Sequence, residues 1–225
     1  MTRGELPELP RPVTLAALQR YVRRMVSARE FTTDRDRVFI LLVEEIGELA
    51  RELSDRRRDP GRAVRQNLAH EIADVLLYLI DVANGFGIEL AGLWDERRPE
   101  PPAPAPPSPG APSQPISSSR PPAQAAGHTA ALNQLVRGAH REGAQSGLAA
   151  ERAVEQQALG LVEQVGEIAT ELRKSWQGLA EPRTAGRPIV AALNHLLRLA
   201  ALLGVEPERA VRDKERQNAD RSWDY

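Results

Sequence analysis

Residues 38–50 read VFILLVEEIGELA, and residues 68–80 read LAHEIADVLLYLI. In both segments the apolar residues recur every three or four positions, which is the spacing of one face of an α-helix. No stretch of the chain alternates apolar and polar residues in the manner of a half-buried strand. The sequence therefore predicts an all-α fold in which these two segments are core helices.

Breaks in the helical pattern predict four helices in the first part of the chain. They are expected at about residues 14–29, 35–57, 63–84 and 89–97. Thr14 is a suitable N-cap for the first helix, and residues 32–34 offer the cap of the second, because short polar side chains accept hydrogen bonds from free amides. Pro60 ends the second helix and Gly85 ends the third.

Proline is concentrated between two helical blocks. Of the 18 prolines, 11 fall in the range from Pro99 to Pro122. A sequence rich in Pro, Ala and Ser favours an extended, solvated chain with a rise of about 3 Å per residue. We therefore expect helical units over residues 1–98 and 127–225, joined by a disordered linker over residues 99–126.

The second block repeats the plan of the first. Residues 42–53 read LVEEIGELAREL and residues 161–172 read LVEQVGEIATEL, so that 8 of 12 positions are identical. Further along, residues 87–89 read GIE and residues 204–206 read GVE at nearly the same offset. These matches indicate an internal duplication.

Composition excludes several classes of protein. The formal net charge is −1, whereas nucleic-acid-binding proteins usually carry a clearly basic face. The chain has no cysteine and therefore no disulfide, thiolate nucleophile or Cys-ligated metal. Its longest apolar runs are far shorter than the roughly 18 residues of a membrane-spanning helix, and its start, MTRGELPELP, lacks the pattern of a signal peptide. We expect a soluble, cytoplasmic protein that binds neither nucleic acid nor a membrane.

Two pairs of carboxylates interrupt the apolar segments. Glu45 and Glu48 are three residues apart on one helix, and Glu71 and Asp74 have the same spacing on the next, so each pair shares a face. Inside apolar segments such side chains are costly to bury unless a positive charge compensates them. If the two helices pack antiparallel, four carboxylates converge, and an oxygen-only ligand set suits Mg²⁺ or Mn²⁺.

Other uses of these carboxylates have different sequence requirements. A single acidic pair on a helix is most often a solvated face, but two pairs on consecutive apolar helices favour a metal site. A di-iron carboxylate site requires Glu-x-x-His motifs. No Glu in this chain is followed by His three residues later, so the di-iron site is excluded.

Together with Glu44, the two acidic pairs resemble the MazG signature, an ExxE motif followed by ExxD. MazG proteins are all-α nucleoside triphosphate pyrophosphohydrolases, and the resemblance covers about residues 14–97 well and 129–223 more weakly. It implies that the four carboxylates of the two pairs are Mg²⁺ ligands. It also implies that Glu44 is either a further ligand or the catalytic group that orients the attacking water.

The second repeat departs from this signature. Gln164 takes the place of Glu45, although Glu167 matches the other carboxylate of that pair. At the offset set by the two glycines, Pro188 and Ala191 take the places of the second acidic pair. The second repeat is therefore not expected to hold a complete metal site.

The tail of the second repeat keeps a feature that the first repeat lacks. Lys214, Asn218 and Arg221 are similar to the Lys-x-x-x-Asn-x-x-Arg ending of many family members, although a solvated helix end is the ordinary alternative. Family members commonly pair subunits so that helices of both surround the nucleotide. By that resemblance we expect two four-helix repeats packed as a pseudo-dimer with one working site, in which this tail binds the substrate phosphates.

The resemblance implies a Mg²⁺-dependent enzyme that hydrolyses a nucleoside triphosphate to the monophosphate and pyrophosphate in nucleotide-pool housekeeping. A half-degenerate repeat is also compatible with a non-catalytic nucleotide-sensing or partner-binding module, and either protein can form a homodimer. Phe31, Phe39, Tyr78 and Trp94 are candidates for stacking on a base, although core packing is favoured for Phe39.

Overall fold

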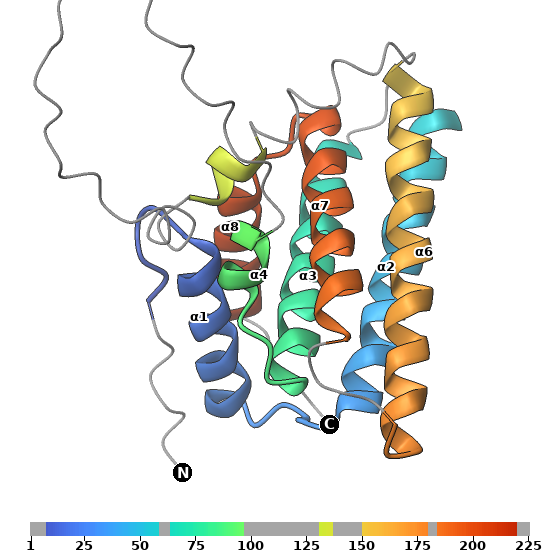
Figure 1. The fold of residues 1–225 in the computed structure, drawn as a ribbon. Coiled ribbons are helices and arrows are strands. Elements are labelled where there is room, and N and C mark those ends of the chain that lie inside the picture. The colour runs from blue at the N-terminus through green and yellow to red at the C-terminus, as the bar shows by residue number, and fades with distance from the viewer. Residues whose placement is uncertain (1–7, 59–63, 97–130, 137–149, 180–183, 220–225) are drawn as a thin grey trace, which may run out of the picture.

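The computed structural model describes residues 8–58, 64–96, 131–136, 150–179 and 184–219 (Figure 1). Its helices, in chain order, are α1 (Leu15–Ala28), α2 (Arg35–Arg58), α3 (Val64–Gly85), α4 (Leu90–Glu96), α6 (Ala150–Trp176), α7 (Gly186–Leu203) and α8 (Pro207–Ala219). A short helical segment, residues 132–136, precedes α6. The described residues contain no strand, which confirms the all-α prediction. The expected linker lies outside the described residues.

The first two helices begin at the predicted caps. Thr14 Oγ1 accepts a hydrogen bond from the amide of Ala17 at 3.1 Å. Asp34 Oδ1 accepts from the amides of Asp36 at 2.9 Å and Arg37 at 3.4 Å. Each cap satisfies amides that have no partner within the helix.

The four long helices α2, α3, α6 and α7 lie side by side in a bundle (Figure 1). The hairpin of α2 and α3 packs against the hairpin of α6 and α7 through contacts of α3 with α7 and of α2 with α6. Leu42, Leu76, Leu161 and Leu196 are fully buried in one continuous hydrophobic core. The two halves of the chain therefore share a core.

The last helix of each half packs against the hairpin of the other half. Helix α4 contacts α7, and α8 contacts α3. At the first of these contacts a Cβ added to Gly186 would lie 2.5 Å from Leu93 Cδ1, so the start of α7 leaves no room for a side chain. The pseudo-dimer and the internal duplication both stay predictions.

The same bend precedes the last helix in both halves. The chain turns by 99° between α3 and α4 and by 94° between α7 and α8. Gly87 and Gly204 adopt left-handed φ values of +68° and +67° at these bends. Glycine suits this conformation because it has no Cβ.

No single helix in the described part of the chain is long and apolar enough to cross a membrane. The two bent pairs at these turns reach the required length and composition only when both helices of a pair are taken together.

Candidate metal and phosphate site

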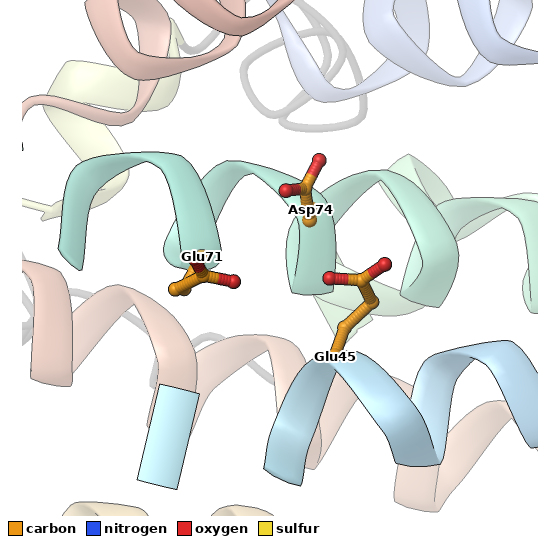
Figure 2. Close-up of side chains that lie close together, drawn as sticks. All are labelled: Glu45, Glu71 and Asp74. Atoms are coloured by element: carbon orange, nitrogen blue, oxygen red, sulfur yellow. The ribbon is translucent and has the colours of Figure 1, made fainter. Parts of the chain in front are cut away.

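Three of the four predicted ligands meet between α2 and α3, which run antiparallel (Figure 1). Glu45 extends from α2 towards Glu71 and Asp74 on α3 (Figure 2). One carboxylate oxygen of each residue lies within 4.8 Å of the other two. Asp74 is buried and the other two are half-buried. The spacing read from the sequence therefore corresponds to a cluster in the fold.

The remaining acidic residues of the motif differ in position. Glu48 lines the same pocket of about 520 Å³ but lies outside the group of three close carboxylates. Glu44 is exposed and is not among the residues that line this pocket, because one position along a helix turns a side chain by about 100°. His70, which was not expected at the site, also lines the pocket.

Burial and mutual repulsion disfavour the charged forms of the cluster. Burial raises the pKa of Glu45 to about 8, and the nearby charges of Asp74 and Glu48 add to the shift. Burial likewise raises the pKa of Glu71 to about 7, with contributions from the same two neighbours. The pKa of Asp74 is also raised, because burial outweighs the opposing hydrogen bond from Lys214. A nearby cation therefore favours the charged form of these carboxylates.

The cluster has the donor set of a site for a hard divalent cation. All of its donors are carboxylate oxygens, which Mg²⁺ and Mn²⁺ prefer. Oε2 of Glu71 is buried and has no hydrogen-bond partner among the described residues. The residues present therefore fit a divalent metal ion.

Helix α8 brings two of the three predicted tail residues to this cluster. Nζ of Lys214 forms an ion pair with Oδ2 of Asp74, and the two side chains are only 14% and 11% exposed. Asn218, one turn further along α8, lines the same pocket, and its Oδ1 is buried without a partner within the described ranges. Arg221 lies outside the described residues. The second half of the chain thus contributes side chains to the acidic pocket of the first.

A buried network that sequence reasoning missed holds α8 against α1. Arg29 Nη2 lies 2.9 Å from Glu215 Oε2, and Arg29 Nη1 lies 3.3 Å from Glu215 Oε1. Both side chains are only 9% exposed, and the hydroxyl of Tyr21 donates to the same carboxylate. Burial, together with the hydrogen bond to Glu215, raises the pKa of Tyr21. Since Glu215 follows Lys214 directly, the network fixes the helix that carries the site lysine.

Comparison with known families agrees with this geometry. A family model described as the MazG nucleotide pyrophosphohydrolase domain matches residues 35–91. This part of the chain is similar to a MazG domain. The matched stretch contains α2, α3 and all four acidic residues of the motif. Neither the curated proteins nor the solved structures gave a match.

Similarity to the MazG domain points to a hydrolase that acts on nucleotides, and members of that family typically use a divalent metal. The acidic cluster lies inside the matched domain and has the donor set for such an ion. Lys214 and Asn218 lie beyond the matched stretch, although they line the same pocket.

Proposed function

We propose that the protein is a Mg²⁺-dependent nucleoside triphosphate pyrophosphohydrolase, for which Mn²⁺ can replace Mg²⁺. It converts a ribo- or deoxyribonucleoside triphosphate and water to the monophosphate and pyrophosphate. The observation that carries this proposal is the meeting of Glu45, Glu71 and Asp74 in a pocket that also contains a buried lysine. Carboxylates for a metal and a cation for phosphate then line one cavity.

Glu45, Glu48, Glu71 and Asp74 would hold the metal in this proposal. A bound Mg²⁺ supplies Lewis-acid chemistry, which neutralises phosphate charge and favours attack by water without a covalent nucleophile. The apolar helices behind the carboxylates restrict solvent and keep the four side chains in position. The water-orienting role expected of Glu44 stays a prediction. Its side chain is exposed and does not line the pocket.

The second half of the chain completes the site in this proposal. Lys214 would neutralise and bind a substrate phosphate, with Asn218 and Arg221 as further phosphate contacts. The contact of Lys214 with Asp74 supports this role, because it places an ammonium group directly beside the proposed metal site. The protein would thus work as a pseudo-dimer with one composite site.

Pyrophosphate release by the full-length protein tests the activity. A panel of ribo- and deoxyribonucleoside triphosphates is assayed with Mg²⁺ and with excess chelator. We expect metal-dependent release of pyrophosphate, which Glu48→Gln should abolish. Glu167→Gln is the control, because Glu167 is the residue of α6 that corresponds to Glu48 but is exposed, and it should leave the release unchanged. A folded protein that is silent across the panel would favour the non-catalytic sensing module instead.

The two lysines of the chain provide the test of the composite site. Lys214→Met is expected to raise KM for the triphosphate and to lower turnover. Lys174→Met is the matched control, because Lys174 pairs with Glu171 on α6 and does not line the acidic pocket. Equal activity of the two variants would contradict the composite site.

A further inference from the structure

The acidic pocket extends along α3 as far as Asp81, which also lines a second, separate hollow near the end of the helix. The second hollow has a volume of about 360 Å³, and Val26 and Asp81 line both cavities. Asp81 lies seven residues beyond Asp74 on the same helix, which corresponds to a rise of about 10 Å. A groove therefore runs along α3 from the proposed phosphate site to Asp81.

The walls of this groove combine apolar side chains with polar ones. Phe31 and Tyr78 line the first cavity together with the acidic cluster and Asp81. Val26, Val38 and Val82 line the second, whose wall also includes Arg23, Thr33 and Arg35. Aromatic and branched apolar side chains are the usual surroundings of a ring system in a binding pocket.

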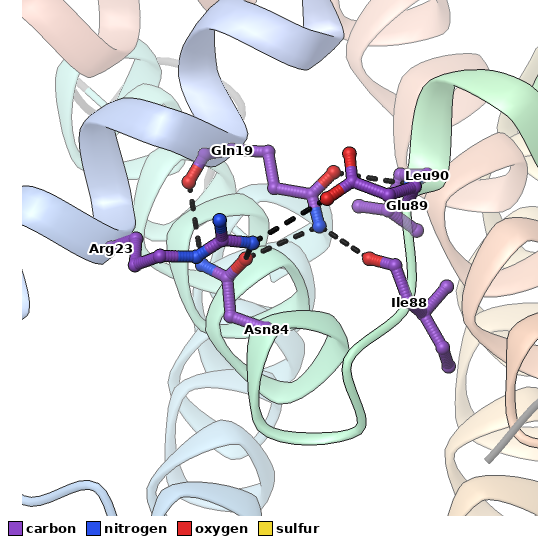
Figure 3. A network of polar contacts seen from close by, with 6 residues as sticks. All are labelled: Gln19, Arg23, Asn84, Ile88, Glu89 and Leu90. Atoms are coloured by element: carbon purple, nitrogen blue, oxygen red, sulfur yellow. Dashed lines mark hydrogen bonds and ion pairs between the residues drawn. The ribbon is translucent and has the colours of Figure 1, made fainter.

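Asp81 differs from its polar neighbour Asn84 in having no partner among the described residues. The side chain of Asn84 is already hydrogen-bonded: its Oδ1 accepts from Gln19 at 3.2 Å and from Arg23 at 3.1 Å, and its Nδ2 donates to the backbone oxygen of Gln19 at 3.3 Å (Figure 3). Within the part of the chain that the structure describes, Asp81 forms neither a hydrogen bond nor an ion pair. A half-buried carboxyl without a partner is therefore directed at the groove.

Building on the proposed function, we propose that the nucleoside of the substrate lies along this groove and that Asp81 selects guanine nucleotides. The two oxygens of a carboxylate accept hydrogen bonds side by side. The Watson–Crick edge of guanine presents two adjacent donors, the ring N1–H and the 2-amino group. Adenine and cytosine place an acceptor beside their amino group and so oppose an ionised Asp81.

The protonation of Asp81 agrees with this role. Burial raises its pKa to about 6, and no charged neighbour contributes to the shift. Near pH 8 the side chain is therefore ionised and accepts hydrogen bonds only. Its burial strengthens a hydrogen bond to a ligand, because less water competes for it.

Binding of non-hydrolysable nucleotides to the full-length protein tests the selection of the base. Titration calorimetry near pH 8 with Mg²⁺ compares the α,β-methylene analogues of GTP, ITP and ATP. We expect GTP to bind about 5- to 150-fold more tightly than ATP, which is the discrimination of a bidentate base contact. ITP, which lacks the 2-amino group, is expected to lie between them. Equal affinities for GTP and ATP would overturn the proposal.

Substitution of the carboxyl should invert the preference. In Asp81→Asn the amide retains one acceptor and gains a donor, which matches xanthine, where a carbonyl replaces the 2-amino group. The variant should lose the preference for GTP and bind the XTP analogue more tightly than wild type does. Asp55→Asn is the matched control, because it makes the same change at the far end of α2, outside both cavities. A preference for GTP that survives in Asp81→Asn would contradict the role of Asp81.

Two further measurements separate this proposal from the proposed function. Guanosine itself, titrated with a chelator present, should bind wild type more tightly than Asp81→Asn, since this contact needs neither metal nor phosphate. Equal binding of guanosine to both proteins would count against base selection. Metal-dependent hydrolysis without a preference for guanine would overturn the base selection alone. Base-selective binding without any hydrolysis would overturn the proposed activity alone.

Discussion

The two helical hairpins of the molecule have similar outer faces and different interiors. Ile40 and Val43 on α2 are exposed, and so are Leu159 and Val162 at the equivalent positions of α6. On the inner side, α2 and α3 present the acidic cluster, whereas α7 contains no Asp or Glu. The second hairpin has a close contact at Gly160 in its interior. A Cβ added to Gly160 would lie 2.4 Å from the ring of His195.

The different interiors of the two hairpins show which residues the fold needs and which residues the site needs. Both hairpins satisfy the apolar pattern that builds the shared core. Within the described ranges, only the first hairpin has a cluster of half-buried and buried carboxylates that repel one another, and packing alone gives no reason to keep them. The helix that follows the second hairpin brings a compensating lysine to this cluster. The two halves thus have similar helical architectures, but the acidic cluster lies in the first half.

The largest expected change in the free energy of unfolding comes from the contact between α1 and α8, which belong to different halves of the chain. Glu215→Gln leaves the Arg29 guanidinium buried without a counter-charge. Breaking a buried ion pair in this way typically destabilises a protein by about 3–5 kcal/mol. Urea unfolding measures the change, and activity should fall as well because Glu215 positions α8 beside the acidic pocket.

Asp213→Asn is the control on the same helix. Among the described residues Asp213 pairs with the exposed side chains of Arg209 and Arg216 alone, so its removal should change the unfolding free energy by less than about 1 kcal/mol. If the two variants lose the same stability, the buried network does not hold α8 against α1 in the way described.

Exchanging one residue between the two halves tests whether the carboxylates of the first half alone form the site. Glu45→Gln gives the first repeat the residue that the second repeat has as Gln164. Activity should fall on the order of 100- to 1000-fold, comparable to the loss of one essential electrostatic contact. The metal-free variant should be at least as stable as wild type, because it removes a carboxyl group whose ionisation the folded protein disfavours. Pyrophosphate release and thermal unfolding measure the two effects.

The reverse exchange, Gln164→Glu, should leave activity unchanged, since α7 offers no carboxylates to complete a second cluster. A gain of metal-dependent activity in that variant would contradict the prediction that the second half of the chain holds no complete metal site.

The architecture was largely predictable because its signals are local. Apolar spacing and the caps at Thr14 and Asp34 depend on residues a few positions apart, and the helices begin where those signals stand. The acidic cluster was also predictable, since Glu71 and Asp74 follow the first pair by one short antiparallel connection. The family resemblance added the tail of α8, which periodicity does not connect to the first half.

Other parts of the site depend on long-range contacts and on helix rotation, which the sequence does not show. Arg29 and Glu215 are 186 residues apart, and neither has a pattern that predicts the other as its partner. Glu44 and Glu45 are adjacent carboxylates, and only the rotation of α2 in the folded bundle decides which one enters the pocket. Asp81 resembles any acidic residue near a helix end until the two cavities on either side of it are known.

The close packing of the second hairpin is tested by two glycine substitutions. Gly160→Ala places a methyl group against the ring of His195 and should destabilise the protein by about 1–3 kcal/mol. Gly47→Ala on α2 meets no atom within 4 Å and should stabilise it by up to about 1 kcal/mol through helix propensity. Chemical denaturation measures both changes, and the same sign for the two would contradict the packing difference.

The smallest expected effect is on the pH dependence of the free energy of unfolding, to which His195 contributes. Its Nδ1 lies 3.0 Å from Gln157 Oε1, and burial, with the nearby charge of Arg198, lowers its pKa below the ordinary value of 6.5. The folded protein therefore binds this proton less readily than the unfolded chain does. The stabilising contribution is present above pH 6.5 and is lost as the pH falls below 6.5 and through the lower pKa of the folded protein. Between about pH 8 and pH 5 wild type should lose more unfolding free energy than His195→Gln, and parallel curves for the two proteins would show that His195 is not held neutral by burial.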